Sequence, residues 1–326
     1  MSGVETLRTA PLLLSRYAES LFWLGRYMER VENLARILDV TDTFVRHGAD
    51  LAGWESVVDI NADAEDFFAK HETATPHTVL DFYLTDKENP NSIAATLFVA
   101  RENARTLRPI ISTEMWAQIN VFYNRVRQLT PADATPQKLS QICTFLKEAC
   151  QAHTGITEGT FFRDQGFSFY SIGKYIERGD QTSRLVDIKY HTILPSLRDV
   201  GSPVDVNQWH ALLRAADGYH AFRRVYPSGM TPALVAGFIL LNHSFPRSIV
   251  LSVYQIEIYL RQLGSGHALR GAYPALERLD ELRAALLDQT IEQIISRGLH
   301  EFLDWVQVEL GILTDTIADA FWRAPA

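Results

Sequence analysis

LFWLGRYMERVENLARILDV, residues 21–40, combines a helical apolar stripe with a dense set of charged side chains. In and just before this stretch, apolar residues recur at intervals of four and three positions, which places them on one side of an α-helix. These residues are Tyr17, Leu21, Leu24, Met28, Val31, Ala35 and Leu38. Similar periodicity runs through most of the chain, including residues 275–323, where its breaks predict two helices. Because alternating strand patterns are missing from the sequence, we predict an all-α fold.

The composition is that of a globular protein with an acidic balance. Of 326 residues, 47% are hydrophobic and 21% are charged, and the formal net charge is -8. Nucleic-acid binding depends on basic side chains that neutralise phosphates, so an acidic chain is a poor match. The longest apolar run, TPALVAGFILLNH, is shorter than the ~20 residues of a membrane span, and no secretory leader is visible. We therefore expect a cytoplasmic protein that binds neither nucleic acid nor membrane.

The sequence shows no motif for a cofactor or a metal. Glycine-rich nucleotide loops and the Gly-x-Ser-x-Gly turn of hydrolases are missing. Cys143 and Cys150 lie two helical turns apart, roughly 10 Å, which is too far for a disulfide, and His153 is the only further Cys or His close by in the sequence. Glu29 and Glu32 form Glu-x-x-Glu without the Glu-x-x-His segments of di-iron bundles. We expect two buried thiols in a reducing compartment, and neither cofactor nor metal.

The stretch at residues 21–40 recurs later in the chain. FYSIGKYIERGDQTSRLVDI, residues 169–188, aligns with it without a gap at an offset of 169 − 21 = 148. The polar pattern is better kept than the apolar stripe, which is unusual for a solvated surface, where any soluble residue serves. The aligned pairs are Gly25 with Gly173, Arg26 with Lys174, Glu29 with Glu177, Arg30 with Arg178, Glu32 with Asp180, Asn33 with Gln181 and Arg36 with Arg184.

Two weaker matches extend the repeat. WESVVD from Trp54 resembles WHALLR from Trp209, and NPNSI from Asn89 resembles FPRSI from Phe245, at an offset of about 155. A repeat of this kind indicates duplicated structural units. We therefore predict a large helical bundle built from two duplicated helical halves, forming a single domain over residues 1–326 with repeats at about 12–155 and 160–326.

Polar residues at 3-4-3 spacing line one side of each repeated helix: Arg26, Glu29, Asn33 and Arg36 in the first, and Lys174, Glu177, Gln181 and Arg184 in the second. Three interpretations are open. The charges form exposed pairs that add little stability, or interior pairs between the helices, such as Glu29 with Arg184 or Glu177 with Arg36. In the third, they form a site that converges on a polar or anionic ligand. The survival of the pattern through the repeat favours the second and third interpretations.

Four segments in fixed order carry a family resemblance. They are AESLFWLGRYMERVENLARILDV, NPNSIAATLFVARENARTLRPIISTEMW, TEGTFFRDQGFSFYSIGKYIERGDQTSRLVDI and FPRSI. Together they resemble the bacterial alpha-E domain family, whose name refers to an all-helical fold with a Glu-Arg motif. That motif is present here as Glu29-Arg30 and as Glu177-Arg178. The resemblance covers nearly the whole chain.

The resemblance implies partners rather than a chemistry. Members of the family are typically encoded beside, or fused to, circularly permuted ATP-grasp ligase-like proteins and transglutaminase-like cysteine-protease proteins. This association implies a role in making, modifying or trimming a peptide or an amide-linked metabolite. We therefore expect an ATP-grasp ligase-like protein and a transglutaminase-like protein as partners, and a peptide as a possible substrate.

Two hypotheses about function follow. In the first, the chain is an accessory protein that acts with an ATP-grasp-type ligase and binds the ligase, the peptide or an intermediate through a Glu/Arg cluster between its halves. In the second, it is an enzyme with Glu29 or Glu177 as the acid/base and arginines that bind an anionic substrate. Several neighbouring arginines should lower the pKa of a carboxyl group, which suits an ion pair better than a base.

Candidate site residues come from the repeat and from the match to the family motifs. The catalytic candidates are Glu29 and Glu177. The substrate-binding candidates are Arg26, Arg30, Arg36, Arg101, Asn103, Arg105, Glu158, Arg163, Lys174, Arg178 and Arg184. Two positions depart from the family pattern, namely Lys174, which is usually Arg, and Gly179, which is usually Ala.

Overall fold

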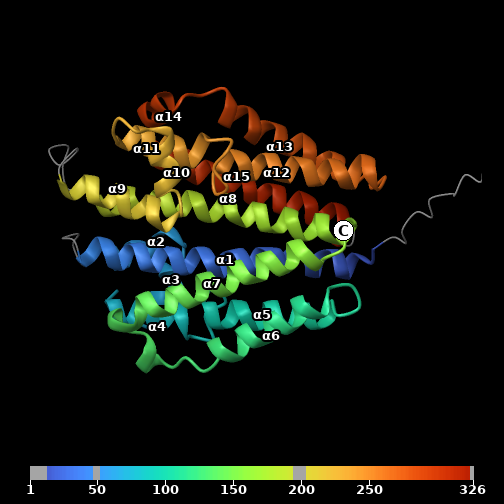
Figure 1. Ribbon diagram of the computed structural model, residues 1–326, viewed down its shortest axis with the longest axis horizontal. Coiled ribbons are helices and arrows are strands. Elements are labelled where there is room, and N and C mark those ends of the chain that lie inside the picture. Colours follow the sequence, from blue (N-terminus) through green and yellow to red (C-terminus); the bar gives the residue numbers. More distant parts are fainter. Residues whose placement is uncertain (1–12, 47–51, 194–202, 324–326) are drawn as a thin grey trace, which may run out of the picture.

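The computed structural model describes residues 13–46, 52–193 and 203–323, and in these ranges every regular element is helical, which confirms the all-α prediction (Figure 1). The elements up to residue 160 are α1 (Ser15–Arg46), α2 (Ala52–Ile60), α3 (Ala64–Phe68), α4 (Pro76–Leu84), α5 (Ile93–Thr106), α6 (Thr113–Val126), the 3₁₀ turn η1 (Pro131–Asp133) and α7 (Pro136–Thr160). The later elements are α8 (Gln165–Ile193), α9 (Pro203–Ala215), α10 (Tyr219–Val225), α11 (Pro232–Leu241), α12 (Ile249–Arg261), the π turn η2 (Gln262–Gly266), α13 (Ala272–Leu287), α14 (Ile291–Arg297) and α15 (Leu299–Phe321).

The C-terminal stretch forms three helices where the periodicity predicts two. Thr290 caps α14 by accepting a hydrogen bond from the backbone N–H of Gln293, whose side chain bonds back in a capping box. Gly298 then separates α14 from α15 with a φ of 117°, a backbone conformation that favours glycine. The apolar spacing continues across this short break, so periodicity alone does not reveal it.

Helices α1 and α8 run side by side through the middle of the molecule, with α5, α6 and α7 on one side and α12, α13 and α15 on the other (Figure 1). The predicted apolar stripe of α1 is buried, and Leu21, Leu24 and Val31 have no exposed surface. Because neighbouring helices cover α1 on several sides, polar residues outside the stripe are buried as well.

Two glycines set the closest approach of α1 and α8. A Cβ atom added to Gly25 would overlap the carbonyl oxygen of Tyr170, and one added to Gly173 would overlap that of Phe22. The backbones therefore touch where the repeat aligns Gly25 with Gly173. The helices run parallel, so residues 148 positions apart stay opposite one another beyond this contact.

The two halves share a pattern of helix neighbours. Helix α1 packs on α5, α7 and α9, and α8 packs in the corresponding way on α12, α15 and α2. Ser92 caps α5 and donates to the carbonyl six residues before it, and Ser248 does the same for α12. This agreement supports the predicted duplication. The duplication itself and the bounds of the two halves stay predictions.

A continuous core of apolar residues spans both halves in the part of the chain that the structure describes. Cys143 and Cys150 are buried in it as free thiols, as predicted, and burial raises the pKa of both. Among the described helices, none has the length and apolar character needed to cross a membrane.

The glycine contact gives a test of the helix pair. The variant Gly173→Ala should lower the free energy of unfolding by about 3 kcal/mol, because its Cβ meets backbone atoms of Phe22 that cannot move aside. The control Gly155→Ala, on α7, places its Cβ where no atom lies within 4 Å, and should raise stability by roughly 0.5–1 kcal/mol. Urea unfolding measures both, and equal stability of the two variants would contradict the close contact.

Candidate functional site

The two Glu-Arg motifs pair with each other across α1 and α8. Arg178 donates from Nε to Glu29 Oε1 and from Nη2 to Glu29 Oε2, both at 2.8 Å. In the mirror arrangement, Arg30 donates from Nε to Glu177 Oε1 at 2.5 Å and from Nη2 to Oε2 at 3.2 Å. Glu29 is 3% exposed and Glu177 is fully buried. Each motif thus supplies the carboxylate of one pair and the guanidinium of the other.

Further side chains donate hydrogen bonds to each carboxylate. Arg26 Nε lies 2.7 Å from Glu177 Oε2, and the amide of Gln181 donates to Glu177 Oε1 at 3.3 Å. On the opposite side, Asn33 donates to Glu29 Oε1 at 3.0 Å and Arg247 Nη1 donates to the same oxygen at 3.2 Å. Because their lone pairs are met by several donors, the two carboxylates are stable as buried anions.

A second layer of pairs ties the central helices to α2 and α9. Arg36 pairs with Glu32 one turn earlier at 2.6 Å and donates to the carbonyl of Ala215, the last residue of α9. Arg184 pairs with Asp180 at 3.0 Å and donates to the carbonyl of Ile60, the last residue of α2. A guanidinium at a helix C-terminus satisfies a free carbonyl and complements the helix dipole.

The resulting groups are named the Glu29 cluster and the Glu177 cluster. The Glu29 cluster consists of Glu29, Glu32, Asn33, Arg36, Arg178 and Arg247. The Glu177 cluster consists of Arg26, Arg30, Glu177, Asp180, Gln181 and Arg184. Both are buried or nearly so, which excludes the interpretation as exposed pairs.

The predicted partners within the interior network are wrong. The pairs predicted from the sequence are Glu29 with Arg184 and Glu177 with Arg36. The structure instead pairs Glu29 with Arg178 and Glu177 with Arg30. The reason is the parallel register, which places each glutamate opposite the arginine of the equivalent motif. Arg184 pairs with Asp180 on its own helix, and Arg36 pairs with Glu32 on its own helix and with Asp217 after α9.

Opposing effects act on the pKa of the two glutamates. Burial raises the pKa of Glu29, but Arg178 and Arg247 outweigh it and hold the pKa well below its usual range. Burial likewise raises the pKa of Glu177, and Arg30 and Arg26 lower it further than burial raises it. Both carboxylates are therefore ionised at neutral pH and make poor proton acceptors.

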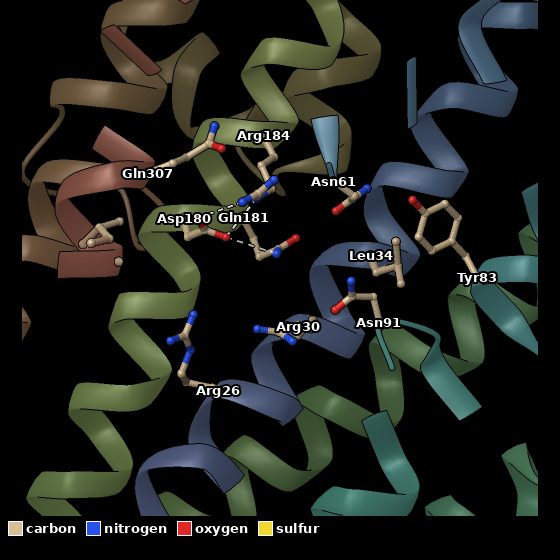
Figure 2. Close-up of a pocket in the computed structure, with 12 residues that line it drawn as sticks. Arg26, Arg30, Leu34, Asn61, Tyr83, Asn91, Asp180, Gln181, Arg184 and Gln307 are labelled. Carbon is tan, nitrogen blue, oxygen red and sulfur yellow. Dashed lines mark hydrogen bonds and ion pairs between the residues drawn. The ribbon is translucent and has the colours of Figure 1, made fainter. Parts of the chain in front are cut away.

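A cavity of about 260 Å³ lies beside the Glu177 cluster (Figure 2). Arg26 and Arg30 approach it from α1, and Asp180, Gln181 and Arg184 from α8. Leu34 of α1 also lines the cavity. The other lining residues come from four further segments: Asn61, Tyr83, Asn91, and Gln307, Leu310 and Gly311 of α15. The lining is predominantly polar, with hydrogen-bond donors and acceptors contributed by both halves of the chain.

The remaining predicted site residues on α5 and around the α7–α8 turn lie outside this cavity. On α5, Arg101 donates to Asn120 at 2.7 Å, and Arg105 pairs with Glu102 at the surface. Asn103 makes a long contact of 3.5 Å with the carbonyl of Ser20. The structure therefore gives Arg101 and Arg105 local contacts on α5 and α6, and Asn103 a contact with α1.

Glu158, Arg163 and Lys174 form no part of the cavity lining. Glu158 and Arg163 form an exposed pair at 2.6 Å near the start of α8. Lys174 is buried close to Glu29, and burial together with Arg178 lowers the pKa of Lys174 to about 8.

Sequence reasoning missed three charged members of the two clusters. Glu32 and Asp180 are aligned in the repeat but lie outside the two rows of polar residues at 3-4-3 spacing. Arg247 lies in FPRSI, a segment of the repeat and of the family resemblance that contributed no candidate site residue. Arg247 comes from the loop before α12 and reaches Glu29 and Glu32. Its distance in sequence from both helices hides this contact, although a charged residue inside a repeated motif is a usable signal.

One group of described residues has the spacing of metal ligands, although the sequence predicts no metal. Ligand atoms of Asp187, His300 and Asp304 lie within 4.8 Å of one another. His300 Nδ1 lies 2.9 Å from Asp187 Oδ1, and although burial lowers the pKa of His300, Asp187 raises it overall. This geometry is that of an ion pair between helices α8 and α15.

The fold and the paired Glu-Arg motifs define a helical protein organised around two buried charged clusters. The chain belongs to the Alpha-E family, described as a predicted alpha-helical domain with a conserved ER motif, which it matches over residues 13–322. It is also 26% identical over 328 residues to uncharacterized proteins of Mycobacterium bovis and Mycobacterium tuberculosis. The alignment covers 88% of this chain and 35% of each relative, so the chain spans about a third of the length of these relatives. No solved structure matches it.

The buried glutamates predict how stability depends on pH. Because the folded pKa of Glu177 lies below its ordinary 4.5, the stabilisation it gives is complete above pH 4.5 and is lost as the pH falls below that value. Glu177→Gln should cost about 3–5 kcal/mol at neutral pH, since it leaves two largely buried guanidinium groups without their anion. The acid limb of its stability curve should also be shallower than that of the wild type.

Urea unfolding between neutral and acid pH measures both effects. The matched control is Glu158→Gln, which removes an exposed pair and should change stability by no more than about 1 kcal/mol. Equal losses in the two variants, or parallel pH curves for Glu177→Gln and the wild type, would show that the buried carboxylate is not ion-paired.

Proposed function

We propose that the protein is an accessory helical binding module that works with an ATP-grasp-type ligase in peptide or amide-bond modification. The observation that carries this proposal is the cavity between α1 and α8, into which Arg26, Arg30 and Arg184 converge (Figure 2). A small concave site with several charged and amide side chains suits a polar peptide or an amide-linked intermediate. The ligase and a transglutaminase-like protein are proposed as partners from the family resemblance. A cytoplasmic setting is proposed from the short apolar runs of the sequence.

The two charged clusters differ in their relation to the cavity. Glu29 and Arg178 lie in a network away from the cavity lining and connect the two halves. Arg26 and Arg30 belong to the network through Glu177 and also line the cavity. Fixed guanidinium groups lose little conformational freedom when a ligand binds, which favours binding by a preorganised site.

The alternative of catalysis by Glu29 or Glu177 has less support. A general base works best with a pKa near the working pH, and arginines lower the pKa of both glutamates. Neither glutamate is among the residues that line the cavity. The geometry therefore favours a binding role over acid/base catalysis.

A blocked cavity provides the test. Gly311 lines the cavity, and a Cβ added to it meets no atom within 4 Å, so Gly311→Phe should fold while its ring occupies the ligand space. In cells that carry the neighbouring ligase, we expect Gly311→Phe to reduce the modified product at least tenfold, measured by mass spectrometry.

The matched control is Gly155→Phe, which adds the same ring to an open position of α7 outside the cavity and should leave product formation unchanged. Co-purification of the ligase with wild-type protein is the second readout. If the product forms equally well in cells that lack this protein, the proposal is overturned.

A further inference from the structure

Asn91 and Arg247 occupy equivalent places in the two halves. The motifs NPNSI and FPRSI align Asn91 with Arg247, and both residues stand directly before a serine that caps the next helix. The two loops thus approach the central helices in the same way. Only the second loop carries a guanidinium group.

Arg247 fills the space beside the Glu29 cluster. Its Nη1 donates to Glu29 Oε1 and to Asn33 Oδ1, both at 3.2 Å, and its Nη2 donates to Glu32. The side chain is 11% exposed. One guanidinium group therefore binds a glutamate, a second carboxylate and an amide oxygen at the same time.

The cavity lies at the corresponding place beside the Glu177 cluster (Figure 2). The counterparts of Glu29, Glu32 and Asn33 are Glu177, Asp180 and Gln181. Asn91 is too short to act as Arg247 does, and its amide donates to Asp63 Oδ1 at 2.7 Å on the wall of the cavity.

Gln181 retains an acceptor without a donor. Its Oε1 atom is buried and accepts no hydrogen bond from the residues that the structure describes. Its Nε2 atom lies 3.3 Å from both Glu177 Oε1 and Asp180 Oδ2. Because those carboxylates only accept, the amide oxygen must point away from them. The equivalent oxygen of Asn33 accepts a hydrogen bond from Arg247. Because buried polar atoms are normally hydrogen-bonded, we expect the Gln181 oxygen to accept one from a group in the cavity.

The charges of the two clusters and their nearest neighbours differ by one cation. Around Glu29, four cations face three carboxylates: Lys174, Arg36, Arg178 and Arg247 face Glu29, Glu32 and Asp217. Around Glu177, three cations face three carboxylates: Arg26, Arg30 and Arg184 face Glu177, Asp180 and Asp63. One guanidinium group from a ligand would give the Glu177 cluster the same excess of one cation as the Glu29 cluster.

We propose that this cavity binds a guanidinium group of the ligand, which donates to Gln181 Oε1 and to the Asp180 carboxylate as Arg247 does to Asn33 and Glu32. This inference rests on the proposed function and names the chemistry of its ligand. Two sources carry the group, an arginine residue within a peptide and a free guanidine-bearing small molecule.

Calorimetric titration with defined probes tests the ligand chemistry. Nα-acetyl-arginine methylamide represents a peptide arginine, agmatine represents a free guanidine, and the citrulline methylamide is the neutral isostere. At least one guanidinium probe should bind roughly tenfold or more tightly than the citrulline probe, because it makes charge-assisted hydrogen bonds. Whether the arginine amide or agmatine binds more tightly identifies the source. Binding of inorganic phosphate in place of both guanidinium probes would overturn the inference.

The variant Asn91→Arg tests the location. It supplies the guanidinium group from the protein itself, so it should keep or raise thermal stability and weaken probe binding at least tenfold. The control Asn124→Arg makes the same change at an exposed position of α6 and should bind the probe like the wild type. Undiminished binding by folded Asn91→Arg would contradict the proposed site.

A second variant covers the case in which Asn91→Arg does not fold. Gln181→Met keeps the side-chain length and removes the buried acceptor. It should weaken the binding of the guanidinium probe roughly tenfold or more. Unchanged binding would overturn the inference. If no guanidinium probe binds but Gly311→Phe still loses the product, the proposed ligand chemistry is refuted. The proposed function as a binding module would then still stand.

Discussion

The reciprocal pairing of Glu29 with Arg178 and of Glu177 with Arg30 is the constraint on which the remaining structure depends. It requires two parallel helices in a fixed register, and Gly25 and Gly173 allow their backbones to come close enough. A shift by one turn would leave four charges buried without partners, at a cost of several kcal/mol for each ion. Buried pairs of this kind add little net stability, but they strongly disfavour other registers.

This network also fixes the geometry of the proposed ligand site. The same arginines that neutralise Glu177 extend to the wall of the cavity, so their positions are fixed before a ligand arrives. On the Glu29 side, Arg247 occupies the equivalent space and closes the network with the chain's own guanidinium group. The near-symmetry of the helices and the difference between Arg247 and Asn91 together account for one filled side and one side with a cavity.

The sequence predicts the helical class, the buried stripe of α1 and the importance of the repeated polar pattern. It does not predict which charges meet, because an alignment of the two stretches gives equivalent residues and leaves their relative register open. The contact of Arg247 with Glu29 joins residues 218 positions apart and is equally hidden. The break at Gly298 depends on a single backbone angle that apolar periodicity does not record. The cavity depends on the short side chain of Asn91. That shortness can be recognised only when Asn91 is compared with Arg247, which occupies the equivalent place in the fold.

A double-mutant cycle on Glu29 and Arg178 tests the central pairing most directly. Glu29→Gln, Arg178→Gln and the double variant are unfolded in urea, and their losses in free energy of unfolding are compared. Reciprocal pairing predicts that the double variant loses less than the sum of the single variants by about 2 kcal/mol or more, because the second substitution removes a charge already left without its partner. Losses that add to within about 0.5 kcal/mol would contradict the pairing of the two motifs.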